Sequence, residues 1–172
     1  GRPSGIDATI ATYAEPILFR KTSNGIMKEK IQIKEPLYLL IINSKEKGIT
    51  KEMVEKVRKF KEENEELFAE ILKEAEEIAL KGKEVLENGS NEKLIPLINR
   101  NQELLKQIGV STSKIDMLVE KCLNLGLPAA KITGSGGGGC IFALCKNKEQ
   151  LSLAEKFEEA YPIEVGGGKN EL

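Results

Sequence analysis

The chain has 172 residues, enough for one domain with a hydrophobic core. Hydrophobic residues make up 40%, charged residues 31% and the net charge is −1, which is typical of a globular protein and lacks the basic excess of a nucleic-acid-binding surface. The longest apolar run, residues 37–42, is too short to cross a membrane. We therefore expect neither a nucleic acid nor a membrane as a partner.

Two gaps in the composition restrict the chemistry. The chain has no histidine, which excludes Ser-His-Asp and Cys-His catalysis and the common zinc sites. Its three cysteines are odd in number and show no CxxC spacing, so we interpret them as reduced thiols of a cytoplasmic protein. Among 27 acidic residues only Asp7 and Asp116 are aspartates, which hints that the shorter carboxylate is needed at these positions.

The first third of the chain predicts a hairpin and a central strand. Residues 1–13 combine a turn with small side chains, because Pro3 and its neighbouring glycines do not fit a helix interior. The strand-like runs 14–20 and 27–33 flank Asn24-Gly25, a strong hairpin signal. Residues 37–43 are continuously apolar and predict a buried central strand.

The remainder predicts helices followed by a return to strands. Four helices are expected, at residues 50–60 with the Thr50 hydroxyl as cap, 64–86 ending at Asn88-Gly89, 91–108, and 111–125. A glycine loop then leads to a strand at 141–145, a helix at 149–160 and a strand at 161–165. This order predicts an α+β fold in which helices cover an antiparallel sheet.

Residues 131–140, KITGSGGGGC, contain five glycines in six positions directly before an apolar strand. Glycine is costly in regular structure, so the run indicates close backbone approach, and successive N–H groups without side chains can form an anion-binding nest. The run satisfies GxGxxG, but a Rossmann loop leads into a helix and a Walker A loop ends in Gly-Lys-Ser/Thr. A ligand-free chain crossing remains an equal alternative.

Asp7 follows the turn at Ser4-Gly5 and is surrounded by small residues that leave room for a ligand. A carboxylate here could accept or orient the proton of a substrate hydroxyl for phosphoryl transfer. An Asx-turn or a helix N-cap is the competing interpretation, and from this segment alone it is favoured.

Taken together, the two segments resemble a known family. GRPSGID resembles the G-x-P-S-G-x-D motif of mevalonate kinases, and KITGSGGGGC resembles their K-[LI]-T-G-[AS]-G-G-G-G-C motif, the third signature of the GHMP kinase superfamily. Between them, residues 101–105 and 109–116 resemble the stretch N-x-x-L-L…[IV]-S-[TH]-x-x-[LI]-D. The resemblance covers essentially the whole chain and implies a GHMP kinase C-terminal domain.

The resemblance implies ATP- and Mg²⁺-dependent phosphorylation of the mevalonate 5-hydroxyl in isoprenoid biosynthesis. It implies that Asp7 is catalytic, that Ser4, Gly5 and Thr50 lie at the substrate, and that a phosphate loop is formed by Gly134, Ser135, Gly136, Gly137 and Gly138. Related enzymes often carry a basic residue two positions before the threonine, where this chain has Gly48; Lys47 is a candidate substitute.

The family's catalytic lysine, its P-x-x-x-G-L-G-S-S-A loop and its Mg²⁺ ligands do not occur in residues 1–172. We therefore expect no metal ligand in this chain, and an N-terminal ATP-binding domain as a partner in the same or a separate chain. Because Gly1 already lies inside a motif, a native start there is not expected. Another GHMP small-molecule kinase and an inactive binding or regulatory module remain alternatives, and a homodimer remains open.

Overall fold

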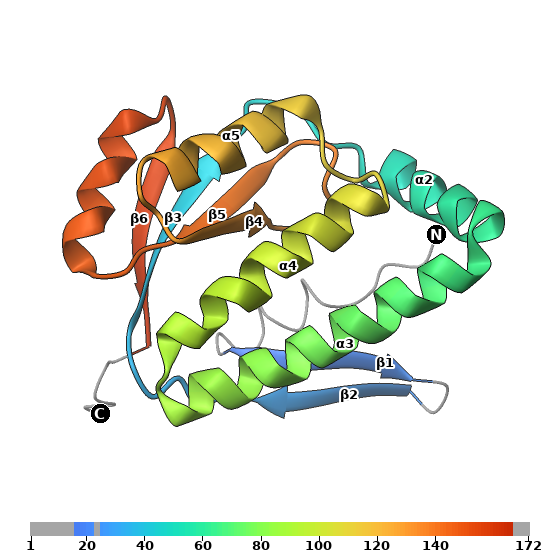
Figure 1. The fold of residues 1–172 in the computed structure, drawn as a ribbon, viewed down its shortest axis with the longest axis horizontal. Coiled ribbons are helices and arrows are strands. Elements are labelled where there is room, and N and C mark those ends of the chain that lie inside the picture. The colour runs from blue at the N-terminus through green and yellow to red at the C-terminus, as the bar shows by residue number, and fades with distance from the viewer. Residues whose placement is uncertain (1–15, 23–24, 167–172) are drawn as a thin grey trace.

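The computed structural model describes residues 16–22 and 25–166 (Figure 1). A two-stranded antiparallel hairpin precedes a four-stranded antiparallel sheet with the strand order β4-β5-β3-β6. The strands are β1 (Ile17–Thr22), β2 (Gly25–Lys30), β3 (Leu37–Asn43), β4 (Ala129–Ile132), β5 (Cys140–Leu144) and β6 (Ala160–Val165). The helices are α2 (Thr50–Glu63), α3 (Glu65–Asn88), α4 (Leu94–Gln107) and α5 (Ser113–Asn124), with 3-10 segments at Asn91–Lys93 and Lys148–Lys156. The expected α+β class is confirmed.

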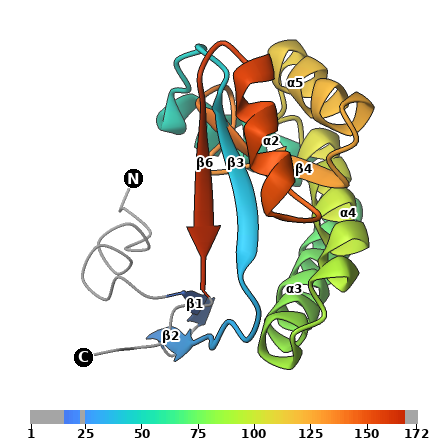
Figure 2. The ribbon, with the colours of Figure 1, turned by 90° about the vertical axis from the view of Figure 1, so that its left-hand side faces the viewer.

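The predicted hairpin is present, with Thr22 paired to Gly25 across the turn. Gly25 has φ +127°, a conformation that side chains with a Cβ rarely adopt, which explains the glycine after Asn24. Figure 2 shows the hairpin beyond one end of β3 and β6, away from α2 and α5. The hairpin is therefore distant from the end of the sheet at which β3 leads into α2.

Strand β3 is an interior strand, as its continuous apolar sequence predicts, because β5 and β6 pair with it on either side. Successive side chains of the strand point to opposite faces of the sheet, so they pack into two separate hydrophobic cores. Leu40 and Ile42, both 0% exposed, join a core with α5 residues such as Ile115. Leu37 and Leu39 join a second core with Leu94 of α4. Both faces of β3 are thus used.

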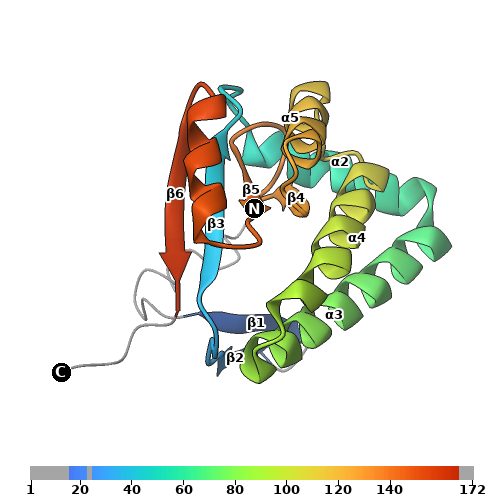
Figure 3. The same ribbon diagram turned by 60° about the vertical axis from the view of Figure 1, so that its left-hand side comes forward.

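Helices α3 and α4 pack beside each other as a connected pair that leaves the sheet at an angle (Figure 3). Gly89 ends α3 in the left-handed conformation at φ +67°, as the Asn88-Gly89 pair predicts. Thr112 caps α5 by accepting a hydrogen bond from the N–H of Ile115. Among the described residues, no helix is long and apolar enough to cross a membrane.

Two local predictions are wrong. Thr50 does not cap α2, because Ile49 occupies the cap position and Thr50 is already the first helical residue. The helix expected at 149–160 is a 3-10 segment that ends at Lys156, and the chain enters the sheet by Ala160, which pairs with Ile42. In both places, contacts to segments distant in sequence determine the local conformation.

Candidate functional site

The glycine loop connects β4 to β5 and lies beside the connection from β3 to α2. The N–H of Ser44 donates to the carbonyl of Gly139, and the N–H of Gly139 donates to the carbonyl of Glu46, both at 2.8 Å. The side chains of Asn43 and Ser44 shape this connection by accepting from the N–H groups of Lys45 and Glu46. Two segments far apart in the sequence are thereby fixed against each other.

Three consecutive glycines of the loop are packed tightly against neighbouring chain. A Cβ on Gly136 would lie 2.5 Å from the carbonyl oxygen of Val110, and one on Gly138 would lie 2.6 Å from that of Glu46. A Cβ on Gly137 would lie 2.7 Å from the sulfur of Met53. All three residues have positive φ, so conformation favours glycine at each. At Gly136 and Gly138 the contact with backbone also leaves no space for a Cβ, whereas the flexible Met53 side chain beside Gly137 can move aside. This part of the loop is a chain crossing, one of the two interpretations left open above.

Two other glycines of the loop face open space. Gly134 and Gly139 have φ +85° and +73°, yet a Cβ on either meets no atom of the described residues within 4 Å. The N–H groups of Gly134 and Ser135 have no backbone acceptor within the part of the chain that the structure describes. Successive N–H groups of a turn that lack internal acceptors can form an anion nest. The loop thus combines a packed crossing with an open side suited to an anion.

The first turn of α2 adjoins this open side. The hydroxyl oxygens of Thr50 and Ser135 lie 3.3 Å apart and are exposed, so they can share a hydrogen bond or turn toward a ligand. The N-terminus of a helix also presents unpaired N–H groups and a partial positive charge that favours anions. Thr50, Ser135 and the N-terminus of α2 therefore lie together with the nest.

The close packing of the glycine loop explains why residue 48 is a glycine. Its own Cβ would lie 2.8 Å from the carbonyl oxygen of Gly136, so any other residue at position 48 would push the glycine loop away. A basic residue, as related enzymes often carry there, therefore cannot enter this arrangement without moving the loop. Lys47 and Lys51 are exposed cations on the same stretch of chain.

Two cysteine thiols in the core of the domain are buried and poorly suited to act as nucleophiles. Burial raises the pKa of the Cys122 thiol to about 12 and that of the Cys145 thiol to about 11. Lys131, at the start of the glycine motif, has a pKa lowered to about 8 by burial. Its Nζ donates to the carbonyl of Ile132 at 2.8 Å and lies 5.5 Å from the centre of the Phe142 ring. Lys131 thus supports the strand that enters the loop.

A cavity of about 630 Å³ lies at the other end of β3, near Tyr38, Asn91 and Lys146. It is separated from the glycine loop by most of the length of β3, which is about 20 Å at 3.3 Å per residue. The Asn91 side-chain oxygen is buried there and has no hydrogen-bond partner in the described part of the chain. Neither Thr50 nor the glycine loop contributes to the described lining of this cavity.

The structure brings some of the predicted site residues together, and others lie outside the residues that it describes. Thr50 lies beside the loop formed by Gly134, Ser135, Gly136, Gly137 and Gly138, with its hydroxyl oxygen 3.3 Å from that of Ser135. Ser4, Gly5 and Asp7 lie outside the described residues. Sequence reasoning missed Gly139, the packing role of Gly48 and the three residues against which the glycines pack. Gly139 belongs to the visible glycine run and could have been included, whereas the others carry no local signal.

The sheet, its helices and the glycine loop have the fold of a GHMP kinase C-terminal domain. Residues 83–163 match the family described as "GHMP kinases C terminal".

Over nearly its whole length, the chain is similar to mevalonate kinases. It is 39% identical over 95% of its length to the mevalonate kinase of Archaeoglobus fulgidus and 36% identical over 98% to that of Pyrococcus furiosus. The crystal structure of the L. major mevalonate kinase in complex with R-mevalonate matches 96% of the chain with a TM-score of 0.89 at 29% identity, and the match covers 53% of that protein. The chain covers 54% and 48% of the two sequence relatives, about half the length of each.

Proposed function

We propose that the protein containing this chain phosphorylates the 5-hydroxyl of mevalonate with ATP, giving 5-phosphomevalonate for isoprenoid biosynthesis in the cytoplasm. One observation supports this above the others: the chain matches over 96% of its length a solved mevalonate kinase whose complex contains R-mevalonate. The open side of the glycine loop is in keeping with it, since the reaction requires a surface that binds anions. The chain then contributes one wall of the active site.

In this proposal the residues of the chain have separate roles. The N–H groups at Gly134 and Ser135 and the N-terminus of α2 stabilise phosphate oxygens, while the packed Gly136, Gly137 and Gly138 hold those groups in place. Thr50 hydrogen-bonds the substrate, and Ser4 and Gly5 form the turn that presents Asp7.

The chemical step is a displacement at phosphorus. The 5-hydroxyl oxygen forms a bond to the γ-phosphorus of ATP, the bond from that phosphorus to the bridging oxygen breaks, and ADP leaves. The hydroxyl proton passes to the carboxylate of Asp7.

The divalent cation and the rest of the phosphate clamp require other residues. Within residues 16–22 and 25–166, no three His, Cys, Asp or Glu side chains come together as a metal site. We therefore assign the Mg²⁺ ligands and the catalytic lysine to a separate ATP-binding domain. The relatives have about twice the length of this chain, which leaves room for such a domain.

The test is an assay of ATP-dependent mevalonate phosphorylation by the complete protein and its Asp7→Asn variant. We expect kcat to fall by roughly 10²–10⁴-fold, because asparagine keeps the shape but cannot accept the proton. Glu63→Gln, an exposed charge change at the opposite end of α2, is the matched control and should keep its turnover. Near-normal turnover of Asp7→Asn would make Asp7 a structural turn residue.

A second arm compares the 172-residue chain with the complete protein. We expect no turnover by the chain alone and turnover once the ATP-binding domain is supplied by fusion or in trans, because the cation clamp is then complete. Turnover by the chain alone would place the ATP site within these residues. Phosphorylation of a different alcohol but not of mevalonate would favour another GHMP small-molecule kinase, and no phosphorylation at all would favour a binding module.

A further inference from the structure

A chain of hydrogen bonds runs from the surface of α5 to the start of the glycine loop. Gln102 of α4 is a buried polar residue, 7% exposed. Its Oε1 accepts from the N–H of Ile132 at 2.9 Å, and its Nε2 donates to the Ser111 hydroxyl at 3.3 Å. The Ser111 hydroxyl donates in turn to Asp116 Oδ1 at 2.7 Å. Ile132 is the last residue of β4, directly before the loop.

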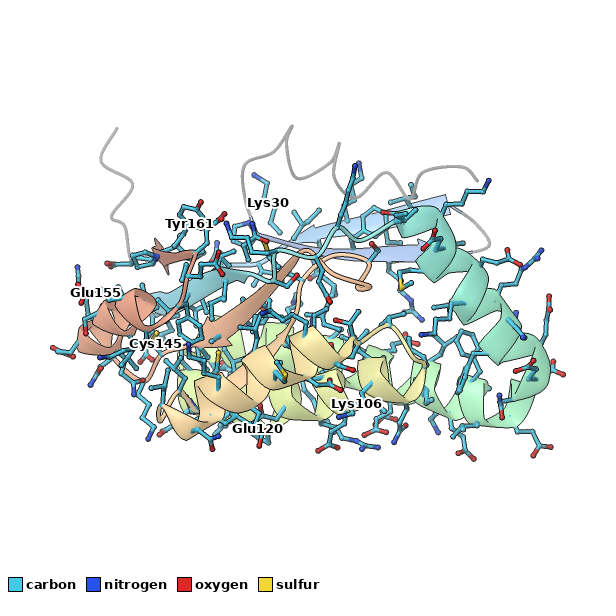
Figure 4. All side chains as sticks on the ribbon, turned by 90° about the horizontal axis from the view of Figure 1, so that it is seen from above. Lys30, Lys106, Glu120, Cys145, Glu155 and Tyr161 are labelled. Atoms are coloured by element: carbon cyan, nitrogen blue, oxygen red, sulfur yellow. The ribbon has the colours of Figure 1, made fainter. Side chains whose placement is uncertain are left out.

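These bonds have only one consistent direction. An ionised aspartate can only accept, so the single hydroxyl proton of Ser111 must go to Asp116. The Ser111 oxygen then has only lone pairs left and must receive the amide N–H of Gln102, which turns the Gln102 carbonyl toward Ile132. Lys106 forms an ion pair with the other carboxylate oxygen of Asp116 at 2.9 Å. In Figure 4, Lys106 lies on the side of the molecule away from Tyr161.

The residues on either side of Ser111 also contact the loop. The carbonyl of Val110 accepts from the N–H of Gly137 at 2.8 Å. The Thr112 hydroxyl donates to the carboxylate of Glu46 at 2.5 Å, and the carbonyl of Glu46 accepts from Gly139. Ser111 is thus connected through Gln102 to Ile132 at the start of the glycine loop. Val110 is connected to Gly137 in its middle, and Thr112 is connected through Glu46 to Gly139 at its end.

We propose that Gln102, Ser111 and Asp116 form a directional relay of positioning residues that sets the place of the glycine loop for phosphoryl transfer. The relay touches no substrate and acts through Ile132 and Val110. It rests on the proposed function, in which the loop borders the transferred phosphoryl group. Positioning matters because a misplacement of about 1 Å can cost about 10²-fold in rate, and buried hydrogen bonds of fixed direction resist such displacement.

The relay can be broken and then rebuilt in the opposite direction. In Gln102→Glu two carboxylates compete for the one proton of Ser111, so the relay fails. Adding Asp116→Asn restores it, since Ser111 then donates to the new carboxylate at position 102 and accepts from the new amide at position 116. Asp116→Asn alone keeps an acceptor for Ser111. Glu103→Gln, a neighbouring exposed charge change on α4, is the matched control.

In the complete protein, we expect Gln102→Glu to lower kcat for mevalonate phosphorylation by about 10–100-fold, with KM changed by less than about threefold. The double variant should recover at least about tenfold of a 100-fold loss. The control variant Glu103→Gln should stay within about threefold of wild type. A double variant no better than Gln102→Glu would overturn the relay.

A second measurement does not depend on activity or on the severity of Gln102→Glu. Ser111→Ala removes one hydroxyl at little change in volume, and hydrogen–deuterium exchange is followed at single amides of the complete protein. We expect exchange at Ile132 and Gly137 to become at least about tenfold faster, with Leu40 in β3 unchanged. Unchanged exchange at both amides would overturn the relay even in an active kinase. Faster exchange in a protein that does not phosphorylate mevalonate would support the relay and reject the proposed function.

Discussion

The glycine loop has a packed side and an open side, and the same residue type serves each for a different reason. On the packed side, Gly136 and Gly138 leave no room for a Cβ beside Val110 and Glu46. On the open side, Gly134 and Gly139 have room but adopt positive φ. Glycine is therefore required by contact on one side and by backbone conformation on the other. The packed side belongs to the fold, and only the open side is free to meet a ligand.

Within residues 134–139, some positions should therefore affect the stability of the fold and others the binding of a ligand. A substitution on the packed side has to displace another segment of backbone, so it affects folding before it affects a ligand. A substitution on the open side strains one residue and leaves its neighbours in place. Variants on the two sides should therefore change different measurements, which makes the comparison testable.

The largest effect is expected on the packed side. Gly136→Val should lower the free energy of unfolding by roughly 3–5 kcal/mol, from the strain of positive φ together with the displacement of Val110. Chemical unfolding of the complete protein measures it. Gly134→Ala is the comparison variant and should cost only the conformational strain, about 1–2 kcal/mol, while weakening nucleotide or substrate binding. Equal losses of stability at the two positions would remove the distinction between the sides.

An intermediate effect is expected at Lys131, in the strand that enters the packed side. Burial lowers its pKa from 10.5 to about 8, so between these pH values the unfolded chain binds a proton that the folded chain does not. Stability contributed through this group therefore rises as the pH rises from about 8 to 10.5 and is flat below 8.

The full pKa shift of Lys131 corresponds to a change of roughly 3 kcal/mol in the free energy of unfolding. We expect about 2 kcal/mol, because the hydrogen bond to Ile132 and the Phe142 ring both favour the charged form. The measurement is the difference in unfolding free energy between wild type and Lys131→Met across this pH range, which cancels the titration of tyrosines and thiols. A difference that does not change with pH would mean that Lys131 stays charged in the folded protein.

The smallest effect on stability is expected at Thr50, on the open side. Thr50→Val removes the hydroxyl and keeps the shape, and the structure shows no helix-capping bond to lose. We expect less than about 0.5 kcal/mol of stability change and an increase in KM for mevalonate of about tenfold, the loss of one hydrogen bond. A large stability loss with an unchanged KM would make Thr50 a structural residue.

The sequence predicts most of the fold because its strongest signals are local. The apolar run 37–43 coincides with β3 to the residue, and Asn88-Gly89 ends α3 as expected. The prediction that Thr50 caps α2 is wrong because a contact distant in the sequence decides where its hydroxyl lies. A threonine before a helical pattern predicts a capping hydroxyl, but the hydroxyl lies instead beside Ser135, 85 positions away.

The candidate site is predictable only in part for the same reason. A run of glycines identifies the loop, yet its sequence does not distinguish the packed from the open positions. That distinction depends on Val110, Met53 and Glu46, which come from other elements and lie far away in the sequence. The Gln102 relay is equally hidden, since a buried glutamine in an amphipathic helix looks like any other polar residue before its partners are known.

The order of strands in the sheet also has a consequence for synthesis of the protein. Both partners of β3 come late, since Ile42 pairs with Ile141 of β5 and with Ala160 of β6. Translation at about 5–20 residues per second leaves this strand without partners for roughly 5–20 s. During that time LYLLIIN, an uncharged and highly apolar segment, has the composition of an aggregation-prone strand. The nascent chain is therefore most exposed to aggregation while residues 44–139 are being made.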